Sequence, residues 1–150
     1  MDTKDQQIIR ALQQNARMTN QELAAAVNLS PSPCLRRVRL LEKAGAIRGY
    51  AAIVDQKIVG YPLTVFMRIR LQQHSADIVM AFEDRIARLD EVMECYLITG
   101  EADYSLRILA RSLEDYERFV RDEIHAIPGI ASMDTSFAYS MIKQRFVFPD

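Results

Sequence analysis

Residues 30 to 47 read SPSPCLRRVRLLEKAGAI, and this stretch decides the fold. At about 100° per residue, a helix here gathers its apolar side chains on one stripe, namely Cys34, Val38 and Leu41. The opposite stripe is polar and cationic and holds Ser32, Arg36, Arg39 and Lys43. The sequence therefore predicts a helix with one side in a protein core and a basic side that suits a groove of a nucleic-acid duplex.

The residues around this helix predict a helix-turn-helix. A first helix is expected from about Asp2 to Asn15, and the capping box in residues 19 to 22 (TNQE) starts a second. Ser30 is suited to cap the third helix, with Pro31 as its first residue and Gly45 at its end. Only about three residues connect the second and third helices, as in DNA-binding helix-turn-helix proteins. A small helical bundle of another kind is the alternative, but the segregated arginine side favours DNA.

Composition limits the number of domains and the class of protein. The chain has 150 residues, 49% of them hydrophobic, which is enough for one domain or two small ones. It contains no apolar run of about 18 residues and no signal-peptide pattern, so we expect a soluble cytoplasmic protein without a membrane partner. Its two cysteines, Cys34 and Cys95, form no CxxC pair and predict neither a disulfide nor a zinc site.

The net charge of −1 conceals an asymmetry. Residues 1 to 60 hold nine Lys or Arg against five Asp or Glu, whereas residues 61 to 150 hold ten against fifteen. Since phosphate contacts supply most non-specific affinity for DNA, the first part is the one expected to touch it. On charge alone, ordinary scatter is the favoured explanation of the difference.

Three regions follow from these patterns. Residues 1–48 form the predicted helix-turn-helix domain. Residues 49–61 form a linker, in which the β-prone runs around Gly49 predict a short hairpin or wing, or simply a strand between two domains. Gly60-Tyr61-Pro62 marks the next boundary, and residues 62–150 form the second domain.

The second domain is expected to follow the order strand, helix, strand, strand, helix, strand. Alternating or β-prone residues place the strands at 64–71, 92–99, 104–110 and about 133–142, and apolar stripes at helical spacing lie between them. This order is the ferredoxin-like plan, with one antiparallel sheet and both helices on one face. The chain as a whole is therefore predicted to be of the α+β class.

The face of the sheet opposite the helices predicts an oligomer. We expect apolar or aromatic residues there as well, contributed by Phe66, Tyr96, Phe137 and Tyr139. A second copy of the chain would cover them, so a homodimer is predicted, with two recognition helices about 34 Å apart. A solvated face is the alternative, since antiparallel sheets often have one.

Several stretches together resemble one family. Residues 29–38 (LSPSPCLRRV) and 41–47 (LEKAGAI) resemble the recognition-helix signature of the Lrp/AsnC, or feast/famine, regulators. Residues 15–17 (NAR) and 100–104 (GEADY) match the same family, so the resemblance spans nearly the whole chain. It implies a bacterial or archaeal transcription regulator with a winged helix-turn-helix and a ferredoxin-like effector domain. It also implies dimers that in many members assemble into octamers or discs.

The resemblance implies specific DNA-facing positions. They are Asn20 and Gln21 at the start of the supporting helix, and Ser30, Ser32, Pro33, Arg36, Arg37 and Arg39 on the recognition helix, beside Lys43 of the cationic stripe. Arg can contact guanine O6 and N7, whereas Ser hydroxyls suit phosphates. Arg37 lies off the cationic stripe, so it is expected to contact a phosphate or to brace Glu42.

The resemblance also implies a pocket for an amino-acid effector between subunits. The matching positions are Tyr96, Thr99, Gly100, Asp103, Tyr104, Leu113, Ser136, Phe137 and Ala138. Asp103 can pair an α-ammonium, and loop amides near Gly100 can hold an α-carboxylate. Without the resemblance, Asp103 is interpreted as a turn residue that bonds its own backbone, and Tyr104 as a strand residue in the core. No cofactor other than this effector is expected.

Three classes of function remain open on the sequence. A ligand-responsive transcription factor is the first, and an architectural DNA-binding protein without an effector is the second. An enzyme is the weakest, because the only histidines, His74 and His125, accompany no nucleophile or carboxylate cluster at catalytic spacing. Neither metal-ligand spacing nor a phosphate-binding glycine motif is found in the sequence.

Overall fold

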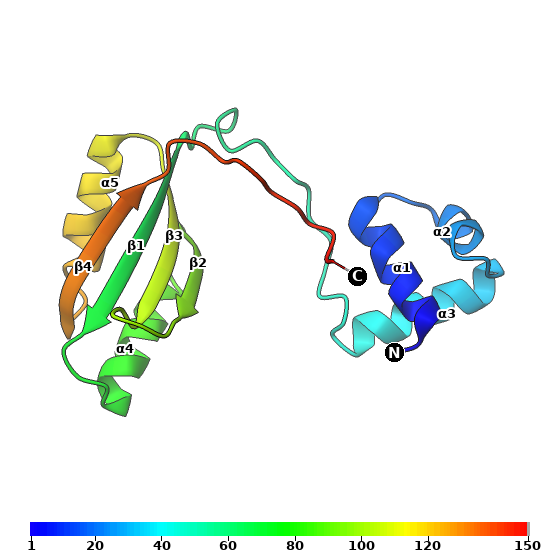
Figure 1. Cartoon of the computed structure of the whole chain (residues 1–150), viewed down its shortest axis with the longest axis horizontal. Helices are drawn as coiled ribbons and strands as arrows, with labels where there is room; N and C mark the ends of the chain where they lie inside the picture. Colours follow the sequence, from blue (N-terminus) through cyan, green and yellow to red (C-terminus); the bar gives the residue numbers. More distant parts are fainter. Residues whose placement is uncertain (150) are drawn as a thin grey trace. The chain divides into compact units, whose positions relative to one another are not determined.

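The computed structural model describes residues 1–149, which form two compact units (Figure 1). The first unit contains Met1–Ile53 together with the described residues from Ile142 onward, and the second contains Val54–Met141. The sequence placed everything after residue 61 in the second domain. By their contacts, the last described residues group with the first unit, and the predicted bounds stay a prediction.

The first unit is built on three helices: α1 (Thr3–Gln14), α2 (Asn20–Ala26) and α3 (Pro31–Lys43). Asp2 with Asp5, and Thr19 with Glu22, form reciprocal capping boxes that start α1 and α2. The capping box predicted at Thr19 is thus confirmed. The helices enclose one small core of buried side chains, formed by Ile8, Leu23, Ala24, Val27, Cys34 and Leu41.

The chain leaves α3 at Gly45, as the sequence predicts. Gly45 has a φ of 73°, in the left-handed region that glycine adopts most easily, and the next amide, that of Ala46, donates to the Leu41 carbonyl at 2.9 Å. The hairpin or wing predicted around Gly49 is wrong for the described chain, because residues 46–55 contain no strand. A strand needs a neighbouring strand to bond with, and in residues 1–149 none pairs with this segment. Instead, the Tyr50 hydroxyl donates to Glu42 at 2.9 Å and holds the segment against α3.

The second unit has the predicted ferredoxin-like order. Its elements are β1 (Leu63–Leu71), α4 (Ala76–Ile86), β2 (Val92–Leu97), β3 (Tyr104–Ala110), α5 (Leu113–Phe119), the π-helical turn η1 (Val120–Ile124) and β4 (Ile130–Phe137). The strands lie in the order β2-β3-β1-β4, and all pairs are antiparallel. The last strand ends at Phe137, earlier than the predicted Ile142, although the amide of Ala138 still donates to Thr64 of β1.

Alternation along β1 separates the two faces of the sheet. Val65, Met67 and Ile69 point into the core, where α4 and α5 cover the sheet (Figure 1). The opposite face, which we call the open face, is lined by an apolar residue, Phe66, and by Arg68. Neither α4 nor α5 packs on it (Figure 1).

Aromatic side chains and ion pairs share the open face. Tyr96 lies on it and is exposed, as is Phe66. Two ion pairs cross between strands there, Arg68 with Asp134 at 2.5 Å and Arg107 with Glu94 at 2.8 Å. The face is therefore a mixture of aromatic rings and paired charges.

The prediction that Phe137 lines this face is wrong. Phe137 pairs with Val65 in the β1–β4 register, so it points toward the helices. Its ring meets that of Tyr116 of α5 edge-on, with the ring centroids 5.3 Å apart. Tyr139, also predicted for this face, follows the end of β4 and is fully exposed.

Candidate functional site

The turn between α2 and α3 fixes how α3 is presented. Asn28 adopts a φ of 52°, and the next amide, that of Leu29, donates to the Ala24 carbonyl at 2.9 Å. The side-chain amide of Asn20, at the start of α2, donates to the Pro31 carbonyl at 2.8 Å and joins the two helices directly. This hydrogen bond lets Asn20 hold the start of α3, and its predicted contact with DNA stays a prediction. Gln21 beside it is exposed.

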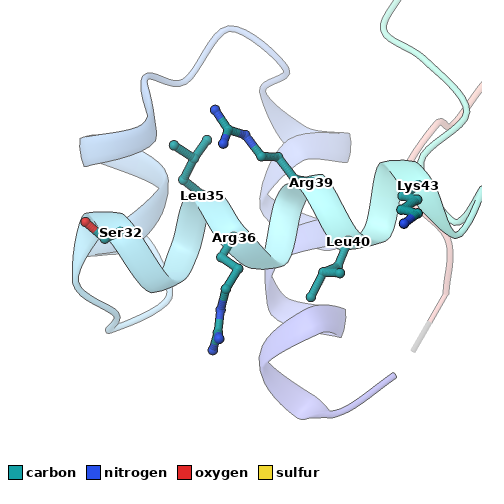
Figure 2. Close-up of a pocket in the computed structure, with 6 residues that line it drawn as sticks. All are labelled: Ser32, Leu35, Arg36, Arg39, Leu40 and Lys43. Atoms are coloured by element: carbon teal, nitrogen blue, oxygen red, sulfur yellow. The ribbon is translucent and has the colours of Figure 1, made fainter.

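A cationic surface, which we call the basic face, runs along α3 (Figure 2). It consists of Ser32, Arg36, Arg39 and Lys43, all exposed, with Leu35 and Leu40 on its two flanks. Cys34 and Leu41, on the other side of the helix, are buried in the core. The amphipathic helix predicted from the sequence is thus confirmed.

The first turn of α3 is also exposed. Ser30 has the extended backbone of an N-cap, but its side chain makes no capping hydrogen bond. Its hydroxyl is therefore not committed to the helix end. Pro33, in the same turn, is exposed as well.

Arg37 does not belong to the basic face. Its guanidinium donates to Asp2 at 2.7 Å and to Asp5 at 2.8 Å, which ties α3 to the start of α1. Hydrogen bonds to these two carboxylates raise the pKa of Arg37. The predicted contact with Glu42 is not formed, because Glu42 instead accepts from Tyr50. Arg37 therefore ties α3 to α1, and its predicted contact with a phosphate stays a prediction.

In the second unit, the predicted effector positions fall into two groups. One group lies at the end of the sheet where β3 starts and contains Tyr96, Thr99, Gly100, Asp103 and Tyr104. The other lies where β1 starts and α5 begins and contains Leu113, Ser136, Phe137 and Ala138. The register puts Tyr104 opposite Ile69, whereas Phe137 is opposite Val65, four residues earlier on β1. A single chain does not bring the two groups together.

Asp103 is engaged within its own chain. The Leu71 amide donates to one carboxylate oxygen at 2.7 Å, and His74 Nε2 lies 2.8 Å from the other. The hydrogen bond from Leu71, and then that from His74, lowers the pKa of the Asp103 carboxyl. The alternative of a turn residue bonding its own backbone does not describe these contacts, because Leu71 lies 32 positions earlier in the chain, and no pattern in the sequence predicts the contact with His74.

Tyr104 is a core residue. It is buried, its ring centroid lies 4.5 Å from that of Phe82, and its hydroxyl donates to Glu83 at 2.7 Å. Burial, and then the Glu83 carboxylate, raises the pKa of the Tyr104 phenol well above its usual range. The alternative of a strand residue in the core therefore fits its position.

Residues 1–149 offer little basis for other kinds of site. No group of three or more metal-ligating side chains is found there. None of the helices in this range combines the length and apolar character needed to cross a membrane. The two cysteines are free, Cys34 in the first core and Cys95 exposed on β2.

Comparison with protein families also divides the chain in two, but it assigns residues 142–148 to the second part, whereas the contacts group them with the first unit. Residues 1–48 match the family of winged helix-turn-helix DNA-binding domains. Residues 64–148 match the family described as the Lrp/AsnC ligand-binding domain. Together the two matches span nearly the whole chain.

Two individual relatives are similar to this chain over most of its length. The Bkd operon transcriptional regulator of Pseudomonas aeruginosa is 36% identical over 149 residues, which covers 99% of this chain and 97% of that protein. The leucine-responsive regulatory protein of Escherichia coli K12 is 33% identical over 96% of this chain and 88% of its own length.

Solved structures resemble the chain equally well. A transcriptional regulator of Neisseria meningitidis, in complex with L-Met, superposes with a TM-score of 0.92 at 36% identity, covering 99% of this chain and 96% of that one. An AsnC family regulator from Agrobacterium tumefaciens gives a TM-score of 0.93 at 34% identity, covering 99% of this chain and 97% of that one.

Proposed function

Because the chain belongs to the Lrp/AsnC family of transcriptional regulators, we propose that it binds double-stranded DNA through α3 and that an amino acid bound to its second unit modulates this binding. The proposal for DNA rests on the basic face. Ser32, Arg36, Arg39 and Lys43 form one exposed stripe on a helix whose other side is locked in a core. A helix of this kind after a tight turn fits the major groove, where the arginines reach guanines or phosphates.

The double variant Arg36→Ala, Arg39→Ala tests the placement of α3. If both side chains contact phosphate, the slope of log affinity against log salt should fall by about 1.8, since each phosphate contact contributes about 0.9. Arg88→Ala, an exposed arginine beyond α4, is the charge-matched control and should leave the slope unchanged. Unchanged affinity and slope in the double variant would show that α3 is not the DNA-binding helix.

We propose that a second copy of the chain completes the effector site. The two groups of predicted effector residues lie at opposite ends of one sheet, so residues of a neighbouring subunit are needed to join them. In this pocket Asp103 would pair with the α-ammonium of the amino acid. Backbone amides near Gly100 would donate hydrogen bonds to its α-carboxylate. The L-Met complex of the Neisseria regulator, which shares the fold at 36% identity, supports an amino acid as the ligand.

Titration with a panel of amino acids tests the effector. An effector should raise the midpoint of thermal unfolding and change either oligomer size or DNA affinity, because a ligand shifts only an equilibrium whose states it binds differently. If no amino acid in the panel changes any of these quantities, the effector proposal is wrong.

An architectural DNA-binding protein without an effector is the second candidate, and one observation favours it. Both oxygens of Asp103 already have partners, Leu71 and His74, in the chain itself. A protein of this kind would bend DNA through an oligomer of basic helices whatever amino acids are present. Unchanged DNA bending across the panel, together with salt-dependent binding, would select this candidate.

We propose a regulatory role and not a catalytic one, because the basic face and the sheet unit are accounted for by DNA binding and ligand binding. Regulation of transcription would place the protein in the cytoplasm, with the DNA. Its partners would be duplex DNA, an amino acid, and a second copy of the chain, with octamers as a further stage of assembly.

A further inference from the structure

The two leucines that flank the basic face are exposed, although Leu35 also borders a hollow that Leu12 and Met18 line. Leu40 is 58% exposed and Leu35 is 38% exposed, whereas the next residue, Leu41, is 6% exposed. Both line the same shallow hollow as Ser32, Arg36, Arg39 and Lys43. The core of this unit is built without them.

Each leucine is the neighbour of one arginine. At about 100° per residue, residues four apart lie side by side on a helix, which pairs Leu35 with Arg39 and Arg36 with Leu40. Figure 2 shows this arrangement: Leu35 and Arg39 extend to one side of the helix, and Arg36 and Leu40 to the other. The surface is thus two pairs, each with one cation and one branched apolar group.

A pair of this kind matches two adjacent features of the major groove. A guanine presents O6 and N7, which accept hydrogen bonds from a guanidinium, and a thymine presents a C5-methyl group that packs against apolar side chains. The leucines are five residues apart, about 7.5 Å along the helix axis, which is about two base-pair steps of 3.4 Å.

We infer that Leu35 and Leu40 determine DNA sequence specificity by packing on thymine methyl groups, each beside a guanine contacted by the neighbouring arginine. This inference rests on the proposed placement of α3 in the major groove. It predicts that each half-site contains two thymines, each next to a guanine, and that the two thymines lie about two steps apart.

Single thymine-to-uracil substitutions test the inference, because they remove the C5-methyl group and keep base pairing. The full chain is used to select a tight site from random duplexes, and each thymine of that site is then replaced in turn. We expect two positions per half-site where the wild type loses about fourfold in affinity, the effect of about one methyl group. Equal affinity for all uracil duplexes would overturn the inference.

Variants assign each position to a leucine. Leu40→Ala should abolish the uracil effect at one thymine and retain it at the other, and Leu35→Ala should do the reverse. Met80→Ala, which shortens an exposed apolar side chain on α4, is the matched control and should retain both effects. If the leucine variants retain both effects but change oligomer size, these side chains contact protein instead of DNA, and the inference is wrong.

The salt dependence separates this inference from the placement of α3. Neither leucine variant should change the slope against salt, because no charge is removed. If the Arg36→Ala, Arg39→Ala variant has a reduced slope but the wild type shows no uracil effect, only the role of the leucines is overturned. An unchanged slope in that variant would overturn the placement of the helix.

Discussion

At the scale of single residues, neighbours in the sequence have separate roles. Arg36 lies on the basic face, while Arg37 is held by Asp2 and Asp5 of α1. The angle between successive residues of a helix makes this separation inevitable, because a step of about 100° moves a side chain from the outer surface to the flank. Adjacent positions on a recognition helix can therefore change DNA binding or stability independently.

We expect Arg37→Ala to lower the midpoint of thermal unfolding by about 2 °C to 4 °C, because both carboxylates lose their partner. Arg36→Ala should leave the midpoint unchanged and weaken DNA binding. Differential scanning fluorimetry and a binding titration on the same samples measure both quantities. Equal midpoints for the two variants would contradict the role given to Arg37.

Asp103 predicts a pH dependence of stability. Its pKa is lowered in the folded chain, first by the Leu71 amide and then by His74, below the value of about 3.9 that an unfolded Asp has. The folded state thus gains stability from the ionised carboxylate above about pH 4, and this gain is lost as the pH falls through the lowered pKa.

We expect Asp103→Asn to lower the stability at pH 7 and to reduce its fall between pH 5 and pH 2. Urea unfolding across this range measures both effects. His74→Ala removes only the second cause and should retain more of the pH dependence than Asp103→Asn does. If wild type and Asp103→Asn show the same pH dependence, Asp103 does not cause the loss of stability at low pH.

At the scale of elements, a single glycine lets the last strand approach α4. Gly129, just before β4, has a φ of 86°, and a Cβ built on it would lie 2.7 Å from Cγ2 of Ile78. Its carbonyl also accepts from the amide of Gln72 at 2.8 Å. Both the backbone conformation and the packing therefore call for glycine at this position.

Gly129→Ala should destabilise the chain by more than the roughly 1–2 kcal/mol that a left-handed backbone costs alanine. Gly60→Ala is the matched control, because Gly60 has a φ of 93° but its Cβ would meet nothing within 4 Å. The difference between the two free energies of unfolding measures the contact with Ile78. If the two variants are equally stable, Ile78 moves aside without cost.

Local patterns in the sequence predicted most elements but not their contacts. The α3 stripe and the alternation of β1 are periodic signals that one helix or strand carries by itself. Phe137 was placed on the wrong face because its side depends on pairing with Val65, which lies 72 positions earlier in the chain. The predicted hairpin or wing around Gly49 is absent from the described chain for a similar reason, because β-prone residues form a strand only where another strand is available to pair.

At the scale of the whole molecule, the open face predicts self-association. Phe66 and Tyr96 are exposed on a sheet face that also carries the paired charges of Arg107 and Glu94. We expect Phe66→Asp to convert dimers to monomers in sedimentation velocity, because the change places a charge in an apolar contact. Met80→Asp, on an exposed helix position of the same unit, should leave the dimer intact. Dimeric Phe66→Asp would show that the interface lies elsewhere.

The site was less predictable than the fold for a physical reason. The basic face lies on one helix, and its members were found by spacing alone. The contacts of Asp103 join residues 71, 74 and 103, and those of Arg37 join two helices, so each depends on the folded chain. The same helical spacing could have predicted that Leu35 and Leu40 are exposed, since they flank the arginines and lie off the core stripe.

The grouping of the last described residues with the first unit bears on the design of chimeras. The side-chain amide of Gln13 donates to the Phe146 carbonyl at 3.2 Å and accepts from the Phe148 amide at 3.4 Å, so the tail closes on α1. The core of the three helices and the segment around Phe146 are thus joined although they lie more than 130 positions apart. A chimera that exchanges the helices between two relatives should therefore exchange this segment with them.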